Sequence, residues 1–259
     1  MKITNLFEQD NNDILVKSKC VYPDGTNKEI EEKVIIEHRM QVIVNDKKIM
    51  SLVCTASYLP ELVVGRLMSE GMLQDINDIE KINICEFGTR ARVNLREGVS
   101  LDLGTKDDEV SSCCTDNQSL FKTRKMPERI TNQKEFKSDE IFKMAESFNS
   151  DTKLHKGTFG THSAYLFYNG DIVFVAEDIG RHNALDKAIG YMYMNKMISE
   201  DCAVFSTGRI PIDMVRKAIY AKLGILVSKA VPTANAIDLA KEYNLKLVCK
   251  AWRDSYQIF

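Results

Sequence analysis

The sequence predicts an α/β protein in which a three-layer α/β/α sandwich follows a smaller β-rich part. From residue 138 onward, helical and strand-like patterns alternate, which is typical of a sheet with helices on both faces. Before residue 105, short runs of β-branched residues predominate and one helical pattern interrupts them. At 259 residues, the chain has room for one large domain or two modest ones. We therefore predict a β-rich domain at 1–105, a connecting loop at 106–137 and an α/β domain at 138–259.

The β-rich domain combines short strand patterns with one helix. A turn at 45–48 contains Asn and Asp, which favour tight turns between strands. The helix starts near Pro60, because proline suits a first turn, and it ends at Gly71, which suits a C-cap. The strands expected here are 14–16, 34–36, 42–44, 82–85 and 92–95.

The loop at 106–137 differs in composition from its surroundings. It begins with acidic residues, continues through a polar segment that contains Cys113 and Cys114, and then becomes basic. Pro127 interrupts any helix in this region. Loops of this length in compact proteins are often functional, so we expect a mobile loop that carries chemistry.

The α/β domain is expected to begin with a helix and a hairpin. The hairpin turns at Asn169-Gly170, which is a strong signal for a two-residue turn. Helices and strands then alternate to the end of the chain. The expected helices are 138–148, 182–196, 211–223 and 233–243, and the expected strands are 163–168, 172–176, 202–205, 225–228 and 246–249.

Polar residues and glycines gather where the strands of this domain meet other elements. Gly160 and Gly208 allow close approach of the backbone, and Arg181 and Arg209 can pair with phosphate through their guanidinium groups. Because ligands of open α/β sheets bind at the ends of the strands, these corners predict one anion-binding crevice. The corners are 157–162, 177–183, 206–211 and 231–235.

The longest polar corner is the stretch 177–187, Glu-Asp-Ile-Gly-Arg-His-Asn-Ala-Leu-Asp-Lys. Taken alone, a capped helix with solvated charges explains it as well as a binding site does, because helix caps also favour Asp and Asn. Together with the other corners, we interpret it as the floor on which a ligand rests. It offers no nucleophile, and its helix has an apolar face at Ala184, Leu185, Ala188, Ile189 and Met192.

These corners resemble the formate dehydrogenase accessory sulfurtransferases, the FdhD family. The matching segments are Gly160-Thr161-His162-Ser163-Ala164, Glu177 to Lys187, Ser206-Thr207-Gly208-Arg209 and Asp213-Met214-Val215-Arg216-Lys217, with Val44-Asn45 and Ser69-Glu70-Gly71 upstream. The resemblance covers about residues 40–259 and implies a cytidine deaminase-like fold and a homodimer.

The activity that the resemblance implies is sulfur relay. A cysteine receives persulfide sulfur from a cysteine desulfurase and passes it to a molybdenum or tungsten bis-molybdopterin guanine dinucleotide cofactor destined for formate dehydrogenase. That cofactor is bound as substrate, and no permanently bound metal is expected. By the same resemblance, the crevice that holds it is lined by His162, Arg181, His182 and Arg209.

The cysteine loop departs from the family pattern Ser-Ser-Cys-Gly-x-Cys-Gly. Cys113 matches the first cysteine, Cys114 replaces a glycine, and Asp116 stands where the second cysteine is expected. The resemblance makes Cys113 the catalytic persulfide carrier, and a single thiol suffices for this task. Whether Cys114 replaces the missing second cysteine stays open, as does whether sulfur transfer is retained. The metal and the identity of the partner enzymes also stay open.

The segment after the last strand aligns with a family segment that contacts the guanine dinucleotide. Trp252, the only tryptophan, is expected to stack on guanine, while Lys250 or Arg253 meets a phosphate. A tryptophan that closes the edge of the core is the alternative. The residues predicted to hold the guanosine are Lys250, Ala251, Trp252, Arg253, Asp254 and Ser255.

Composition and motifs disfavour several other functions. The net charge of −2 and the lack of a basic stripe argue against nucleic-acid binding. No signal-like or membrane-spanning stretch is evident, so we expect a soluble, cytoplasmic protein whose other cysteines, Cys202 and Cys249 among them, are buried and structural. A deaminase needs His-x-Glu and Cys-x-x-Cys motifs, which are absent. A hydrolase that pairs Cys113 with His162 or His182 stays open, and the main competing function is a non-catalytic protein that carries or protects the cofactor.

Overall fold

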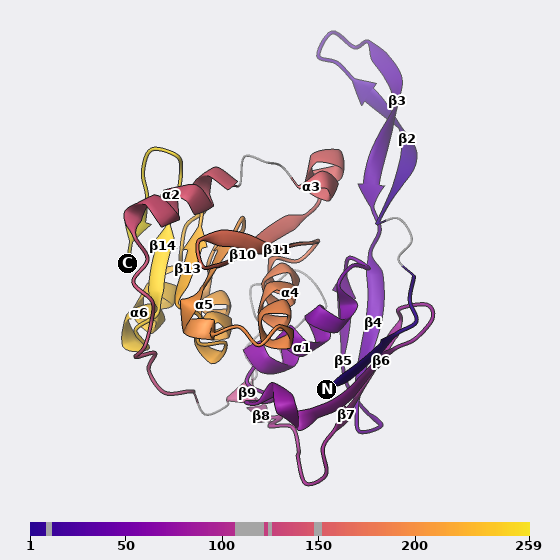
Figure 1. The fold of residues 1–259 in the computed structure, drawn as a ribbon. Helices are drawn as coiled ribbons and strands as arrows, with labels where there is room; N and C mark the ends of the chain where they lie inside the picture. The colour runs from indigo at the N-terminus through magenta and orange to yellow at the C-terminus, as the bar shows by residue number, and fades with distance from the viewer. Residues whose placement is uncertain (9–11, 107–121, 124–125, 148–151) are drawn as a thin grey trace.

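The C-terminal half of the chain builds one six-stranded sheet (Figure 1). The computed structural model describes residues 1–8, 12–106, 122–123, 126–147 and 152–259. Neighbouring strands run parallel in the middle of the sheet and antiparallel toward both edges. Their order is β11 (Asp171–Asp178), β10 (His162–Tyr168), β12 (Cys202–Ser206), β13 (Ile225–Ser228), β14 (Lys246–Cys249) and β15 (Gln257–Ile258).

Helices cover both faces of this sheet, because its strands carry apolar side chains on both sides. Leu166 and Val204 face the helices α4 (Arg181–Met194), α5 (Ile212–Tyr220) and α6 (Ala234–Glu242), in one continuous buried core. Phe167 and Phe205 belong to a second buried cluster that includes α2 (Ser138–Ser147). The predicted α/β class is confirmed, while the likeness to cytidine deaminases remains a prediction.

The N-terminal part forms a second, five-stranded sheet with its own core. The helix α1 (Leu59–Ser69) packs on it, and Leu62, Val63 and Leu67 are fully buried there. The helix begins with Pro60 in its first turn, and Gly71 follows its end with φ +67°, as the sequence predicts. The strand order is β1 (Lys2–Asn5), β6 (Ile79–Ile84), β7 (Arg90–Leu95), β4 (His38–Val44) and β5 (Lys47–Cys54).

The helices α1 and α4 join the two parts, and their backbones approach closely. A Cβ atom on Gly65 would lie 1.7 Å from the carbonyl oxygen of Asp186. A Cβ atom on Gly190 would lie 1.9 Å from the carbonyl oxygen of Glu61. Only glycine fits at either position, because real Cβ atoms do not approach other atoms this closely.

Several elements differ from the expectation. The strand patterns near residues 14 and 34 belong to a long two-stranded ribbon, β2 (Asp13–Val21) and β3 (Asn27–Ile35), which projects away from both sheets (Figure 1). The short helix α3 (Lys153–Thr158) and the strands β1 and β15 were not expected, because segments this short carry little periodicity. Two more short strands pair with each other, β8 (Thr105–Lys106) at the start of the predicted loop and β9 (Lys122–Thr123) within it.

Two 3₁₀ turns complete the described elements, at Ile76–Asp78 and Ser199–Asp201. Cys113, Cys114 and the rest of segment 107–121 lie outside the described residues. Within the described ranges, no helix is both long and apolar enough to cross a bilayer.

Candidate functional site at one edge of the six-stranded sheet

The polar corners predicted from the sequence meet at one edge of the six-stranded sheet. His162, the first residue of β10, pairs with Asp178, the last residue of β11. Near the same end, Ala164 pairs with Ser206, and Ser206 pairs in turn with Ser228, the last residue of β13. The register therefore places the start of β10 beside the ends of β11 and β12, and the end of β12 beside the end of β13. We call this side of the sheet the strand-end edge.

A cavity of about 300 Å³ opens at the strand-end edge. Its volume falls at the lower end of the range for small-molecule sites. Thr207 is held in its wall, because its Oγ1 accepts a hydrogen bond of 3.0 Å from the backbone N–H of Ser163. None of the lining residues is acidic; they are His155, Phe159, Gly160, Thr161, His162, Thr207 and Lys229.

His162 lies half-buried among cationic groups. Burial lowers the pKa of its imidazole below the ordinary value of 6.5, and the charges of Arg181, His155, His182 and Lys229 lower it further. At neutral pH, His162 is therefore an uncharged imidazole near the cationic side chains of Arg181 and Lys229. This environment favours an anionic ligand, because such a ligand would offset the surrounding positive charge.

Arg181 is the first residue of α4, and it lies near enough to His162 for its charge to affect the imidazole. Its aliphatic carbons pack on Gly208, where an added Cβ atom would lie 2.9 Å from the Cβ atom of Arg181. Its Nε and Nη2 atoms are shielded from solvent and have no hydrogen-bond partner among the described residues. A guanidinium group in this state can donate to an oxyanion through its fork. The two corners that carry Arg181 and Gly208 thus meet in space, as the sequence predicts.

Glu177, near the end of β11, connects the strand-end edge with α3. Its carboxylate accepts hydrogen bonds from the backbone N–H groups of Leu154, at 3.1 Å, and His155, at 2.7 Å. The His155 Nδ1 atom lies 2.8 Å from the carbonyl oxygen of Thr161. Since the carbonyl oxygen can only accept, the Nδ1 atom carries the proton and donates it. Glu177 and Thr161 therefore position His155 in the cavity wall, and of these two only Thr161 also lines the cavity.

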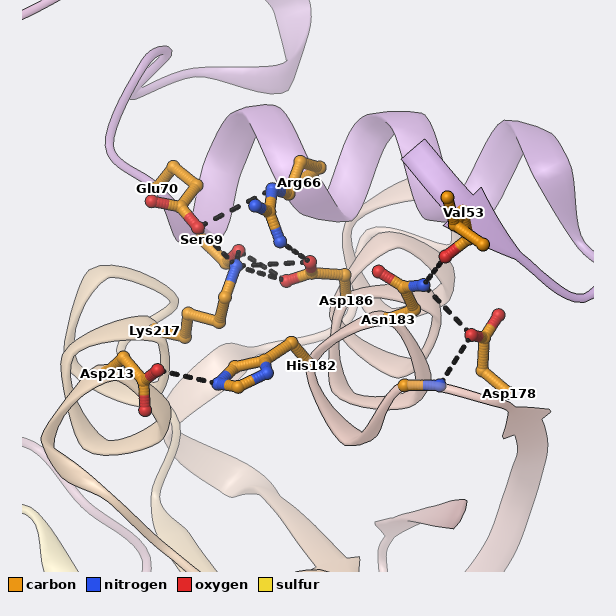
Figure 2. Close-up of polar contacts among 11 residues, drawn as sticks. Val53, Arg66, Ser69, Glu70, Asp178, His182, Asn183, Asp186, Asp213 and Lys217 are labelled. Carbon is orange, nitrogen blue, oxygen red and sulfur yellow. Dashed lines mark hydrogen bonds and ion pairs between the residues drawn. The ribbon is translucent and has the colours of Figure 1, made fainter. Parts of the chain in front are cut away.

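His182 is buried and pairs with α5. Its Nε2 atom lies 2.8 Å from a carboxylate oxygen of Asp213, and both side chains are largely shielded from solvent (Figure 2). Burial alone would raise the pKa of Asp213, but the hydrogen bond and charge of His182, together with the charge of Arg181, lower it overall. His182 is not part of the cavity lining. Its contact with Asp213 holds α4 against α5.

The remaining polar residues of stretch 177–187 point toward the N-terminal part. Lys187 and Asp178, both fully buried, form an ion pair of 2.6 Å. The Lys187 ammonium group also donates to Thr55 Oγ1 at 2.7 Å, and the backbone N–H of Thr55 donates to Asp178 at 3.0 Å. Asn183 donates to Asp178 and to the carbonyl oxygen of Val53 (Figure 2). These contacts tie α4 to the end of β5.

A second buried cluster lies where α1, α4 and α5 meet (Figure 2). Asp186 accepts hydrogen bonds from Lys217 at 2.9 and 3.1 Å, from Arg66 at 3.2 Å and from Ser69 at 2.6 Å. Lys217 also lies 2.7 Å from Glu70. Two cations and two carboxylates balance each other here, as buried charges require. The stretch 177–187 was interpreted from the sequence as the surface on which a ligand rests. In the structure, Asp186 of this stretch instead joins α4 to α1 and α5.

The C-terminal segment follows β14 at the strand-end edge. The backbone N–H of Lys250 donates to the carbonyl oxygen of Ala230, and that of Ala251 donates to Ser228. Trp252 is 50% exposed, so half of its surface is open to a ligand. The other predicted residues of this segment are exposed apart from Ala251, and Arg209 is exposed after β12.

Among the described cysteines, Cys54, Cys202 and Cys249 are buried, whereas Cys20 and Cys85 are only partly buried, contrary to the expectation for cysteines outside the loop. Cys202 and Cys249 are fully shielded from solvent, which confirms the prediction that they are buried, and burial raises the pKa of both, and of Cys54, to about 12. Burial would also raise the pKa of Cys85, but hydrogen bonds from Thr89 and neighbouring backbone N–H groups lower it overall. The predicted carrier Cys113 lies outside the described residues.

The structure brings the predicted residues His162, Arg181 and His182 together at the strand-end edge. His155, Phe159 and Lys229 also line the cavity, but they are not among the site residues predicted from the sequence. His155 was missed because it sits on a helix too short to predict, and Lys229 because it follows a short strand, Ile225–Ser228, without a glycine or charged residue to mark the corner. The glycine-rich corner at 157–162 was the signal that could have identified Phe159. Among the residues that the structure describes, no group of three or more His, Cys, Asp or Glu is placed to hold a metal ion.

Comparisons with known proteins agree on one family. The sequence model of the FdhD/NarQ family matches residues 35–259. The chain is 32% identical over 229 residues to the "Sulfur carrier protein FdhD" of Listeria monocytogenes serotype 4b, covering 86% of this chain and 88% of that protein. It is 30% identical over 252 residues to the protein of the same name from Bacillus pumilus, covering 94% and 95%.

A solved structure shares the fold. The crystal structure of a protein assigned as a formate dehydrogenase accessory protein from Desulfotalea psychrophila superimposes with a TM-score of 0.75. The match covers 96% of this chain and 97% of that one, at 24% identity. The arrangement of both sheets is thus found in an experimentally determined relative.

Proposed function

Because the chain belongs to the FdhD/NarQ family of sulfur carrier proteins linked to formate dehydrogenase, we propose that it relays sulfur through a persulfide on Cys113. The donor is a cysteine desulfurase. The acceptor is the molybdenum or tungsten bis-molybdopterin guanine dinucleotide cofactor, which the protein binds as a substrate before formate dehydrogenase receives it. The protein would do this in the cytoplasm as a homodimer.

The observation that carries this proposal is the cation-lined cavity at the strand-end edge. The cofactor carries phosphates, and the cavity offers Lys229, Thr207 and His162, with Arg181 at its border. Among the described residues that line it, none carries a carboxylate that would repel an anion. The segment Lys250 to Ser255, exposed apart from Ala251, and the exposed Arg209 follow strands of the same sheet, and we propose that they extend the site toward one of the two guanosines of the cofactor.

The sulfur step is a thiol–disulfide type exchange. The Cys113 thiolate attacks the outer sulfur of the desulfurase persulfide, the S–S bond to the donor cysteine breaks, and that cysteine leaves as a thiolate. No net oxidation or reduction occurs, because one persulfide replaces another. The described thiols Cys54, Cys202 and Cys249 are poor alternatives, since burial raises their pKa values to about 12 and keeps them protonated.

Persulfide loading tests this proposal directly. After incubation with a cysteine desulfurase and cysteine, the intact protein should gain about 32 Da, the mass of one sulfur atom. The gain should vanish in Cys113→Ser and survive in Cys114→Ser, as measured by intact-protein mass spectrometry. Cys85→Ser is the matched control, because Cys85 is a described thiol whose pKa is lowered. Loading that survives in Cys113→Ser would contradict the proposal.

A non-catalytic carrier is the competing function, and the altered cysteine loop favours it. The family's second cysteine is replaced by Asp116, so the thiol pair of the family pattern is incomplete. This alternative predicts no mass gain on Cys113 together with binding of a guanine nucleotide. A mass gain on Cys113 that the acceptor cofactor discharges would exclude it.

Anion binding at the strand-end edge should depend on pH through His162. In the free protein, the pKa of His162 lies below 6.5, whereas a bound oxyanion would raise it by favouring the imidazolium form. Binding then takes up a proton, so affinity rises as pH falls, by up to about tenfold per pH unit between the two pKa values. Sulfate is a suitable probe because its own charge is constant in this range.

Titration of the histidine ring signals by NMR, with and without sulfate, measures both pKa values of His162. His162→Gln is the control, and it should flatten the pH dependence of sulfate affinity. The pKa of Asp213 is lowered below the ordinary value of 3.8, so this carboxylate stays ionised through the range and does not mimic the effect. An unchanged pKa of His162 in saturating sulfate would contradict the prediction.

A further inference from the structure

Phe159 has an unfavourable backbone conformation and is exposed to solvent. It follows α3 with φ 50° and ψ 13°, in the left-handed region that favours glycine. Bulky residues are rare there, because the Cβ atom crowds the backbone. The side chain gains nothing from burial in return, since it is 80% exposed. Both properties cost the free protein stability, so neither the fold nor the core explains why an aromatic residue is present.

The position of Phe159 points to a ligand. Phe159 lines the cavity at the strand-end edge together with His162, Thr207 and Lys229. Its ring meets the imidazole ring of His155 edge to face, with the centroids 5.9 Å apart and the planes at 71°. This contact supports one side of the phenyl ring while most of its surface stays open. An aromatic surface therefore stands beside a cluster of oxyanion donors.

We propose that Phe159 is a stacking platform for the heteroaromatic ring of a nucleotide whose phosphate binds among His162, Thr207 and Lys229. The inference rests on the proposed function, because the acceptor cofactor carries guanine nucleotide groups. It adds a binding residue that the sequence analysis did not identify. Within this site, the polar residues select a phosphate and the phenyl ring selects a planar base.

The chemistry of the two parts supports one ligand class. A phenyl ring stacks on a planar heterocycle with little loss of side-chain freedom, because only two torsions are fixed. Lys229 supplies positive charge, and the Thr207 hydroxyl and the imidazole of His162 supply hydrogen bonds for a phosphate. A free phosphate would use only the polar part, and an apolar ligand would use only the ring. A phosphate linked to an aromatic base uses both.

The decisive experiment compares guanosine diphosphate with inorganic pyrophosphate as probes, using isothermal titration calorimetry on the full-length protein. Phe159→Gly should weaken guanosine diphosphate binding about tenfold or more, because base–aromatic stacking is lost. Pyrophosphate binding should be unchanged in the same variant. Phe159→Trp should retain the affinity for guanosine diphosphate, since a larger ring also stacks. Lys229→Gln should weaken both probes, because it removes charge from the phosphate part.

Phe159→Gly is also a favourable substitution for folding, since glycine adopts positive φ without strain. Its melting temperature should equal or exceed that of the wild type, so lost binding cannot be attributed to unfolding. Phe87→Gly is the matched control, because Phe87 is 72% exposed but lies on the turn between β6 and β7 of the other sheet. This control should bind guanosine diphosphate like the wild type.

Three outcomes would overturn the inference. One is equal guanosine diphosphate affinity in the wild type and Phe159→Gly. Another is loss of affinity in Trp252→Ala alone, which would place the base on the C-terminal segment. The third is an absence of guanosine diphosphate binding by the wild type. Loading of sulfur on Cys113 requires no nucleotide, so the mass gain on Cys113 tests the proposed function independently of these three outcomes.

Discussion

Replacing Lys187 by methionine is expected to lower the free energy of unfolding by about 3–5 kcal/mol, because it leaves the buried Asp178 carboxylate without its cation. Both side chains are completely shielded from solvent, and the ion pair is 2.6 Å long. The ammonium group also donates to Thr55, so the variant breaks a connection between α4 and the N-terminal part. Methionine nearly preserves the volume, which isolates the loss of charge and hydrogen bonds from the loss of packing.

Urea unfolding followed by circular dichroism measures this effect. The matched control is Lys143→Met, which breaks the ion pair of 3.0 Å between Lys143 and Asp171. Those side chains are 57% and 81% exposed, so the control should change stability by only about 0–1 kcal/mol. Adding Asp178→Asn to Lys187→Met should recover part of the loss, because the uncompensated charge is removed. If Lys187→Met costs no more than Lys143→Met, the buried pair does not stabilise the fold.

The same residues show why the sequence predicted the helix 182–196 better than its role. The apolar positions Ala184, Leu185 and Ala188 indicate one face, and in the structure that face packs on the six-stranded sheet. The opposite face carries Asp186 and Lys187, which a local pattern assigns to solvent. Among their partners, Arg66 precedes Asp186 by 120 positions and Thr55 precedes Lys187 by 132, so no spacing rule could connect them.

Site residues were predictable from the sequence where a histidine or arginine stands close to a glycine that marks a turn. His162 follows Gly160 by two positions at the start of β10, Arg181 directly follows Gly180 after β11, and the structure brings both to the strand-end edge. Lys229 follows an apolar strand without any motif, and His155 depends on Glu177 to hold its short helix. Tertiary contacts of this kind are set by the register of the sheet, which a single sequence specifies only through its hydrophobic pattern.

The crossing of α1 and α4 leads to the second large effect. Gly190→Ala is expected to destabilise the protein by about 3 kcal/mol or more, at the upper end for overpacked cores. The new Cβ atom would lie 1.9 Å from the carbonyl oxygen of Glu61 and 2.9 Å from the backbone nitrogen of Gly65. Both are backbone atoms of α1, so no change of rotamer relieves the clash. The helices must separate, which would open the apolar and ionic contacts between the two parts.

Gly157→Ala is the control for this variant. Gly157 lies in α3, and a Cβ atom there would meet only the flexible end of Lys33, at 3.4 Å. Alanine in a helix at this position should stabilise the protein by about 0.4–1 kcal/mol, by restricting the unfolded chain. Urea midpoints that move in opposite directions for the two variants would show that the crossing, and not glycine content, determines stability.

Guanosine diphosphate binding by Gly190→Ala then tests whether the helix crossing matters to the site. Arg181 and His182 begin the same helix that Gly190 positions, so separation of α1 and α4 would displace the cations next to His162. Affinity measured in the fraction that remains folded should therefore fall together with stability. Normal affinity in a destabilised variant would instead mean that the strand-end edge is held by the six-stranded sheet alone, and that the contacts between α1 and α4 serve only to join the two parts.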